Sequence, residues 1–296
     1  MSSREKNNNN IITYKMSSKI IRGIKNIIIF ILHVILPKDS LEVLDRQGIV
    51  SSLRHFRDKI TLANWVGLLN YRTRDLWVQE KLRDIPRGLS VLDAGAGIQM
   101  YKNSCKHLKY TSQDFGEFTG AMTERDKMTT DVQYNTKTCD IISNITKIPV
   151  ADGSFDVILC TEVFEHIPEP ALAVKEFSRI VRPGGKVIIT APFCSLTHQS
   201  PFYFANGYSK YWYEKILTDH GFKIQEISYN GNFFEYMAQE IRRIPNVSKQ
   251  YLMKNTGILT KLQIYFLLRK LHKLSVKDKE SQELLCFGLQ VVAVKT

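Results

Sequence analysis

The sequence predicts an α/β protein with a Rossmann-like, doubly wound, largely parallel β-sheet. The first observation is that apolar strand segments alternate with helical segments through much of the chain. The second is a glycine turn that directly follows the first strand, in VLDAGAGIQMYK at 91–102, where a helix is expected to start near Ile98. The third is the length of 296 residues with 44% hydrophobic residues, which is enough for one large core.

The expected strands follow one another along this core. In order, their sequences are LSVLDAG, LKYTSQDF, DIISNI, FDVILCT, KVIITAP, FKIQEIS and CFGLQVVAVK. The helix PALAVKEFSRIVR, which Pro170 opens, separates the fourth from the fifth. Ligands of such sheets bind at the carboxyl ends of the strands, so the functional site is expected there.

The chain divides into segments by composition and periodicity. A basic amphipathic segment (1–40) and a helical cap (41–87) precede the ligand-binding core (88–231). A basic helical insertion (232–285) follows, and residues 286–296 supply the final strand of the core.

The positive charge lies at the two ends of the sequence. The formal net charge is +12, of which residues 1–40 carry +5 and residues 241–280 carry +8, so the middle is close to neutral. A nucleic-acid enzyme more often has its basic surface around the catalytic domain, so no nucleic-acid partner is expected.

The cysteines are few and scattered, with no C-x-x-C pair, at positions 105, 139, 160, 194 and 286. This usage favours the reducing cytoplasm and indicates neither a disulfide framework nor a zinc site. No cluster of metal-ligand residues is visible along the sequence, so no metal requirement is predicted.

The N-terminal segment has a cationic face and an apolar face at helical spacing. Its apolar stretch at 27–36 is too short to span a bilayer, which takes about 20 residues. No small-residue cleavage site follows, so a removed signal peptide is not expected. Two interpretations stay open: a helix that lies on the inner face of the membrane, or one packed on the protein body or on a second subunit of a homodimer.

The glycine turn narrows the class of ligand. A dinucleotide fingerprint has a third small residue, whereas Met100 stands at that position after Gly95 and Gly97. The Gly-Lys-Ser/Thr of a phosphate-binding loop is absent. Asp114 ends the next strand, 21 residues after Asp93, where a carboxylate can accept hydrogen bonds from two ribose hydroxyls. These residues indicate an adenosine without pyrophosphate.

Three features of the sequence carry a resemblance to a known family: VLDAGAG, Asp114 and ITKIPVADGSFDVILCTEVFEHIPEPALAVKEFSRIVRPGGKVIITAP. Together they resemble the class I S-adenosylmethionine-dependent methyltransferases, over about residues 88–230. The similarity is to the branch with ubiquinone-pathway and sugar methyltransferases. It implies a seven-stranded sheet with an antiparallel last strand and S-adenosyl-L-methionine as cofactor. It also implies that Asp93, Gly95, Ala96 and Gly97 line the methionine and ribose, and that Asp114 holds the ribose hydroxyls.

The same resemblance implies further cofactor contacts. Phe115 stands where an adenine-stacking side chain is often found. Asn144, followed by Ile145, replaces the usual aspartate that bonds the adenine amino group, and its amide oxygen can still accept that bond. Cys160 and Glu162 leave the fourth strand beneath the sulfonium.

Two histidines are candidate general bases. His198 lies just past the fifth strand in APFCSLTHQSPFYF, among aromatic side chains that can cover a substrate. His166 in EVFEHIP is the second candidate, and a positioning role is favoured for it because the family has this histidine across many chemistries. For His198 the alternative is a surface loop histidine.

The expected reaction is O-methylation of a sugar hydroxyl or of another small or lipid-linked acceptor. Methyltransferases of nucleic-acid bases carry an Asn/Asp-Pro-Pro-Tyr motif just after the fourth strand. CTEVF stands there in this sequence, so methylation of amino groups on nucleic-acid bases is disfavoured. The segment THQSPFYFANGYSKYWYEKILTDHGFKIQEI resembles methyltransferases of surface-polysaccharide synthesis, so the expected partner is a lipid-linked glycan at a membrane surface. The alternatives are a quinone- or lipid-type methyltransferase and a non-catalytic scaffold that keeps the fold.

Overall fold

A computed structural model describes residues 65–118 and 138–296. The basic segment 1–40 and the first half of the expected cap, residues 41–64, lie outside the described residues. Within the described ranges, no helix is both long and apolar enough to cross a bilayer.

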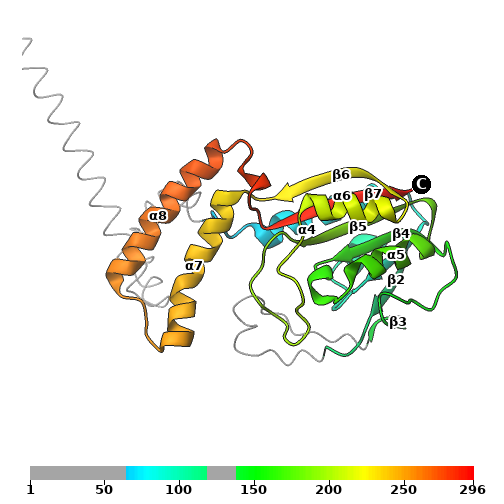
Figure 1. The fold of residues 1–296 in the computed structure, drawn as a ribbon, viewed down its shortest axis with the longest axis horizontal. Coiled ribbons are helices and arrows are strands. Elements are labelled where there is room, and N and C mark those ends of the chain that lie inside the picture. The colour runs from blue at the N-terminus through cyan, green and yellow to red at the C-terminus, as the bar shows by residue number, and fades with distance from the viewer. Residues whose placement is uncertain (1–64, 119–137) are drawn as a thin grey trace, which may run out of the picture. The chain divides into compact units, whose positions relative to one another are not determined.

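The core is a seven-stranded sheet with the strand order β3-β2-β1-β4-β5-β7-β6 (Figure 1). Strands β1 to β5 pair in parallel, whereas β7 is antiparallel to both of its neighbours, β5 and β6. The strands are β1 Ser90–Ala94, β2 Lys109–Asp114, β3 Ile141–Ile142, β4 Phe155–Thr161, β5 Val181–Pro192, β6 Phe222–Asn230 and β7 Gly288–Lys295. The predicted fold class, including the antiparallel last strand, is confirmed.

Helices cover both faces of the sheet. On one face α4 (Asn70–Arg83) packs Val78 and Leu82 against the strands. On the other face α5 (Pro170–Ile180) and α6 (Lys210–Asp219) bury apolar side chains such as Phe177 and Leu217 in the larger core cluster. The two clusters lie on opposite sides of the strands because alternate side chains of a strand point to opposite faces.

The segment after β1 is a series of turns, so the helix predicted to begin near Ile98 is wrong. Gln99 has a φ of 57°, a left-handed conformation that does not continue an α-helix. The N–H groups of Lys102 and Ser104 bond to carbonyls three residues earlier, and a short 3-10 helix, η1 (Lys102–Cys105), follows. Tyr101 is buried beside it and donates to Asp75 Oδ1 of α4 at 2.8 Å.

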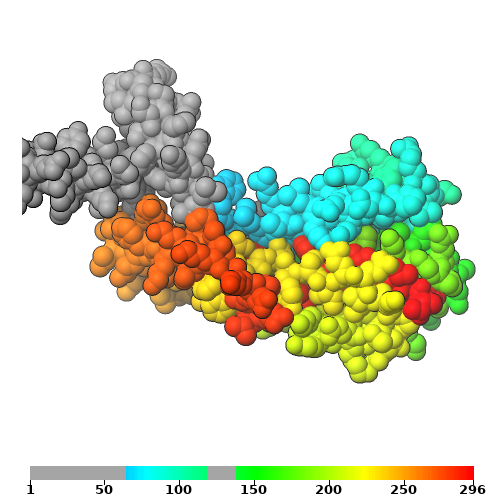
Figure 2. All heavy atoms as spheres, turned by 90° about the horizontal axis from the view of Figure 1, so that it is seen from above, coloured from blue at the N-terminus to red at the C-terminus, as the bar shows by residue number. Residues whose placement is uncertain are grey.

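In the sequence, two long helices separate β6 from β7: α7 (Phe233–Leu252) and α8 (Ile258–Lys277). They pack against each other beside the sheet, with α8 in orange in Figures 1 and 2. A small apolar cluster of Val66, Ala238, Leu268 and Leu271 joins them to the residues before α4. Strand β7 returns from this helical pair into the sheet between β5 and β6.

Candidate active site

A cavity of about 1050 Å³ opens at the carboxyl ends of β1, β2, β4 and β5. Its walls come from the glycine turn, the start of α4, the loop after β5 and one side of α7. Glu165 and His166 of the 3-10 helix η4 (Phe164–His166), which follows β4, also line the cavity. The cavity therefore lies where parallel sheets bind their ligands.

The glycine turn follows the edge of this cavity. Gly95 has a φ of +74°, and a Cβ there would lie 2.5 Å from Val163 Cγ2. Packing against the loop after β4 therefore already requires a glycine at this position. Gly97 has a φ of 51°, and its N–H donates to Asp114 Oδ2 at 3.1 Å. Ala96 completes the turn at the cavity wall.

Two buried carboxyl groups lie at the base of the turn. Asp114 Oδ1 accepts the N–H of Gly116 at 3.0 Å, so each of its oxygens holds one amide and keeps a lone pair for a diol. Burial raises the pKa of Asp114. Asp93 accepts the hydroxyl of Tyr110 at 2.6 Å, and burial raises its pKa to about 7 despite that bond.

The residues expected around adenine lie together at one end of the cavity. The Phe115 ring meets the Phe202 ring edge-on with centroids 5.0 Å apart, and Ile145 lines the wall nearby. Asn144 Oδ1, however, already accepts the N–H and the hydroxyl of Thr146, both at 2.9 Å. The amide nitrogen is therefore the atom left for a ligand, not the oxygen that the sequence analysis expected.

Cys160 does not line the cavity, so its assignment as a cofactor contact is wrong. It is fully buried in the hydrophobic core beneath α5 and α6. Side chains alternate along a strand, so when one residue faces the core the next one faces away. Thr161 and Glu162, the next two residues, do reach the cavity.

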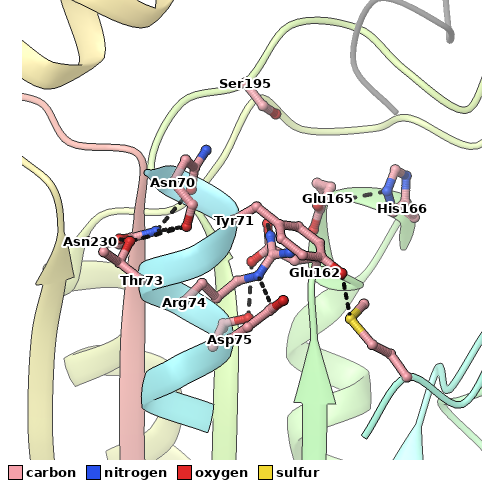
Figure 3. A network of polar contacts seen from close by, with 12 residues as sticks. Asn70, Tyr71, Thr73, Arg74, Asp75, Glu162, Glu165, His166, Ser195 and Asn230 are labelled. Carbon is pink, nitrogen blue, oxygen red and sulfur yellow. Dashed lines mark hydrogen bonds and ion pairs between the residues drawn. The ribbon is translucent and has the colours of Figure 1, made fainter. Parts of the chain in front are cut away.

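Glu162 holds an arginine that the sequence analysis missed (Figure 3). Its Oε2 lies 2.8 Å from Arg74 Nη1, and its Oε1 accepts the Thr190 hydroxyl at 2.9 Å. The Arg74 guanidinium lies over the Tyr71 ring, 5.0 Å from its centroid, and its side chain is only 12% exposed. In YRTRDLW the structure leaves Arg72 exposed and Arg74 partly buried, a difference that the sequence pattern does not reveal.

Both candidate bases lie in the cavity, together with Glu165, which the sequence analysis did not select. His166 Nδ1 lies 2.6 Å from the carbonyl oxygen of Phe202, and His198 Nδ1 lies 2.8 Å from that of Leu196. A carbonyl only accepts, so each Nδ1 carries a hydrogen, and in the neutral form of each ring Nε2 is the acceptor. The two rings are 4.8 Å apart.

Burial controls the charge of this cluster. Glu165 is 1% exposed, and burial followed by the nearby Glu162 raises its pKa well above the usual value. Burial, and after it the His198 ring, lowers the pKa of His166 to about 4. His166 is therefore neutral near pH 7 and acts as a hydrogen-bond acceptor through Nε2.

Comparison with known proteins shows similarity to methyltransferases over part of the chain. Residues 92–189 match the family model described as "Methyltransferase domain". A ubiquinone biosynthesis O-methyltransferase of Azotobacter vinelandii is 25% identical over 114 residues, 38% of this chain and 48% of that protein. An uncharacterized methyltransferase of a Mycobacterium species is 30% identical over 116 residues, 39% of this chain and 43% of that protein. Residues 92–189 form a class I S-adenosylmethionine-dependent methyltransferase domain.

The chain spans about half the length of the curated relatives it matches. Among solved structures, geranyl diphosphate methyltransferase in complex with SAM aligns with 12% identity over 76% of this chain and 85% of that chain, with a TM-score of 0.45. The phosphoethanolamine N-methyltransferase 2 of Haemonchus contortus aligns with 18% identity over 75% of this chain and 52% of that chain, with a TM-score of 0.43.

S-adenosyl-L-methionine is the cofactor of this domain, and the cavity has the donor set to hold it. Asp114 presents two carboxylate oxygens for a ribose diol, and the carboxylate of Glu162 suits a cationic sulfonium or ammonium. The Arg74 guanidinium suits the carboxylate of the methionine part.

Proposed function

We propose that the protein is an O-methyltransferase whose acceptor is a hydroxyl of a sugar or of a similar small, lipid-linked molecule. The observation that carries the proposal is the pair of free Nε2 lone pairs on His166 and His198, in the same cavity as the cofactor-binding turn. Such atoms bind a hydroxyl and receive its proton. Methyl transfer from a sulfonium otherwise needs mainly alignment of the acceptor and exclusion of water.

The acceptor enters beside α7. Gln239, Arg242, Arg243 and Asn246 of this helix line the cavity, and Arg243 Nη1 pairs with Glu240 at 2.6 Å. Guanidinium and amide groups recognise phosphates and sugar hydroxyls by charge-assisted or multiple hydrogen bonds. The polar wall thus favours an acceptor with hydroxyl groups and an anionic group, such as a sugar linked through a diphosphate.

The same helix pair supports association with an anionic membrane surface. Large apolar side chains are exposed where α7 ends and α8 begins, with Leu252 66%, Met253 87% and Leu259 67% exposed. Lysines accompany them at 249, 254 and 261. An apolar tip with cationic neighbours suits the headgroup region of an anionic bilayer, which would keep the protein at the inner face of the membrane. Burial of the tip in a homodimer is the competing arrangement.

A second candidate function is methylation of a phenolic quinone precursor or a lipid. The curated relatives named as ubiquinone biosynthesis O-methyltransferases favour it. The aromatic side chains around the histidines, including Phe202 and Tyr203, would suit a flat ring as well as they suit a sugar face.

The first test is calorimetric binding of S-adenosylmethionine and S-adenosylhomocysteine, with NAD as the negative comparison. Transfer of a labelled methyl group is then measured to nucleotide-sugars, lipid-linked sugars and phenolic quinone precursors. Transfer to the sugar acceptors supports the first function, and transfer to phenols alone supports the second. Absence of cofactor binding would leave a scaffold without methyltransferase chemistry.

A further inference from the structure

We propose that Glu165, His166 and His198 bind one divalent transition-metal ion at the acceptor end of the cavity. The inference deepens the proposed O-methyltransferase function and rests on it for the role of the ion. One ligand atom from each residue lies within 4.8 Å of the other two, a separation that small side-chain rotations bring to the distances around a single ion. His166 Nε2 is already only 3.7 Å from Glu165 Oε1.

Both imidazoles are held in the way that metal-binding histidines usually are. Metal-bound histidines commonly donate the hydrogen of their second nitrogen to a carbonyl or carboxylate, which fixes the ring and its tautomer. Here the carbonyl of Phe202 receives the hydrogen of His166, and that of Leu196 receives the hydrogen of His198. The Nε2 atoms are therefore preset as electron-pair donors.

The cluster contains a buried polar atom without a hydrogen-bond partner. Two imidazole Nε2 atoms and the Glu165 carboxyl group face one another, and Glu165 Oε2 is buried with no hydrogen-bond partner among the described residues. A buried polar atom without a partner costs free energy and calls for an explanation such as a missing ion. A cation between the three side chains would satisfy all of these donors at once.

The ligand types restrict the choice of ion. Two imidazoles and one carboxylate suit first-row ions such as Zn²⁺, Fe²⁺, Mn²⁺ and Co²⁺ better than Mg²⁺ or Ca²⁺, which prefer oxygen ligands. Three protein ligands also leave coordination positions open, as in catalytic sites and unlike closed structural sites.

An open position gives the ion a defined role. An acceptor hydroxyl bound there has a lowered pKa and loses its proton to water. Its oxygen then forms the bond to the methyl carbon, and the electron pair of the broken S–CH3 bond stays on sulfur, so that S-adenosylhomocysteine is released. With the ion bound, the histidines position it and water takes the proton, whereas without an ion their Nε2 atoms receive the hydroxyl proton directly.

The test uses the full chain, stripped with a chelator and titrated with Co²⁺, whose visible spectrum reports its ligands. We expect one Co²⁺ per chain, and at least about 10-fold weaker binding in His198→Ala and in Glu165→Gln. His220→Ala, which changes a histidine at the end of α6, is the matched control and should bind Co²⁺ as the wild type does. His198→Cys should restore binding and add a sulfur-to-cobalt charge-transfer band.

Binding of S-adenosylhomocysteine is measured on every variant to separate the two proposals. No Co²⁺ binding to the wild type, or equal Co²⁺ binding to wild type and His198→Ala, overturns the metal site. The proposed function fails instead if Co²⁺ binds as expected but neither the cofactor nor any acceptor does. His198 lies on a partly exposed loop, so its variants are expected to keep the fold even if Glu165→Gln does not.

Discussion

The two ends of the cavity are built in different ways. The end that we expect to hold the cofactor is made by the turn after β1 and the end of β2, where Asp114 accepts backbone N–H groups from Gly97 and Gly116. The end that we propose for the acceptor is made by side chains from η4, the loop after β5 and α7, which are far apart in the sequence. Backbone geometry of the sheet therefore determines the first end, and packing of helices and loops determines the second.

The largest expected effect is at the cofactor end. Asp114→Ala removes both acceptors for the ribose, so S-adenosylhomocysteine should bind about 100-fold more weakly, since hydrogen bonds to a charged group are worth about 1.5–3 kcal/mol each. Asp152→Ala, which removes a carboxylate with 79% side-chain exposure and an ion pair to Arg179, is the control and should bind normally. Calorimetry measures both, and equal affinities would show that the ribose lies elsewhere.

A second comparison separates backbone strain from steric clash. Gly95 and Gly184 have nearly the same φ, +74° and +75°, but a Cβ at 95 meets Val163, whereas nothing lies within 4 Å of one at 184. Strain at a positive φ costs about 1 kcal/mol, so Gly184→Ala should lower the free energy of unfolding by that amount and Gly95→Ala by about 2–4 kcal/mol. Denaturant unfolding with Gly95→Ala/Val163→Ala should recover the difference, and no recovery would contradict the clash.

The arginine of α4 tests whether the cap contributes to cofactor binding. Arg74→Gln leaves Glu162 without its cation and removes the partner for the methionine carboxylate, so cofactor affinity should fall about 10-fold, since a charged hydrogen bond is worth about 1.5 kcal/mol or more. Arg72→Gln changes an exposed arginine on the same helix and should have no effect. If both variants bind alike, Arg74 serves only to hold α4 to the sheet.

The smallest effect on chemistry is expected at the tip between α7 and α8. The double variant Leu252→Glu/Met253→Glu should reduce co-sedimentation with anionic vesicles several-fold, because two exposed apolar side chains become charged near a negative surface. Methylation of a water-soluble acceptor should stay unchanged. Val276→Glu, at the other end of α8 and 73% exposed, is the matched control. Unchanged vesicle binding combined with loss of a dimer in sedimentation would indicate a subunit interface instead.

The sequence by itself determined the fold class and the positions of the strands, and it predicted which residues meet at the glycine-turn end of the cavity. These features depend on short-range patterns: apolar strand segments, a glycine turn directly after β1 and an acid at the end of β2. In a parallel sheet such residues necessarily meet at one edge, so sequence spacing alone predicts their proximity. The match of residues 92–189 to the methyltransferase domain follows the same motifs.

Only the tertiary structure decided where individual side chains point and which distant segments meet. It placed Cys160 in the core, used the oxygen of Asn144 in a local turn, and brought Arg74 of the cap against Glu162. It also joined His198 to Glu165 and His166, which lie more than 30 residues earlier in the chain, and no spacing pattern reveals this. The physical reason is that these contacts depend on long-range packing, where one step along a strand or one loop path changes which side chains enter the cavity.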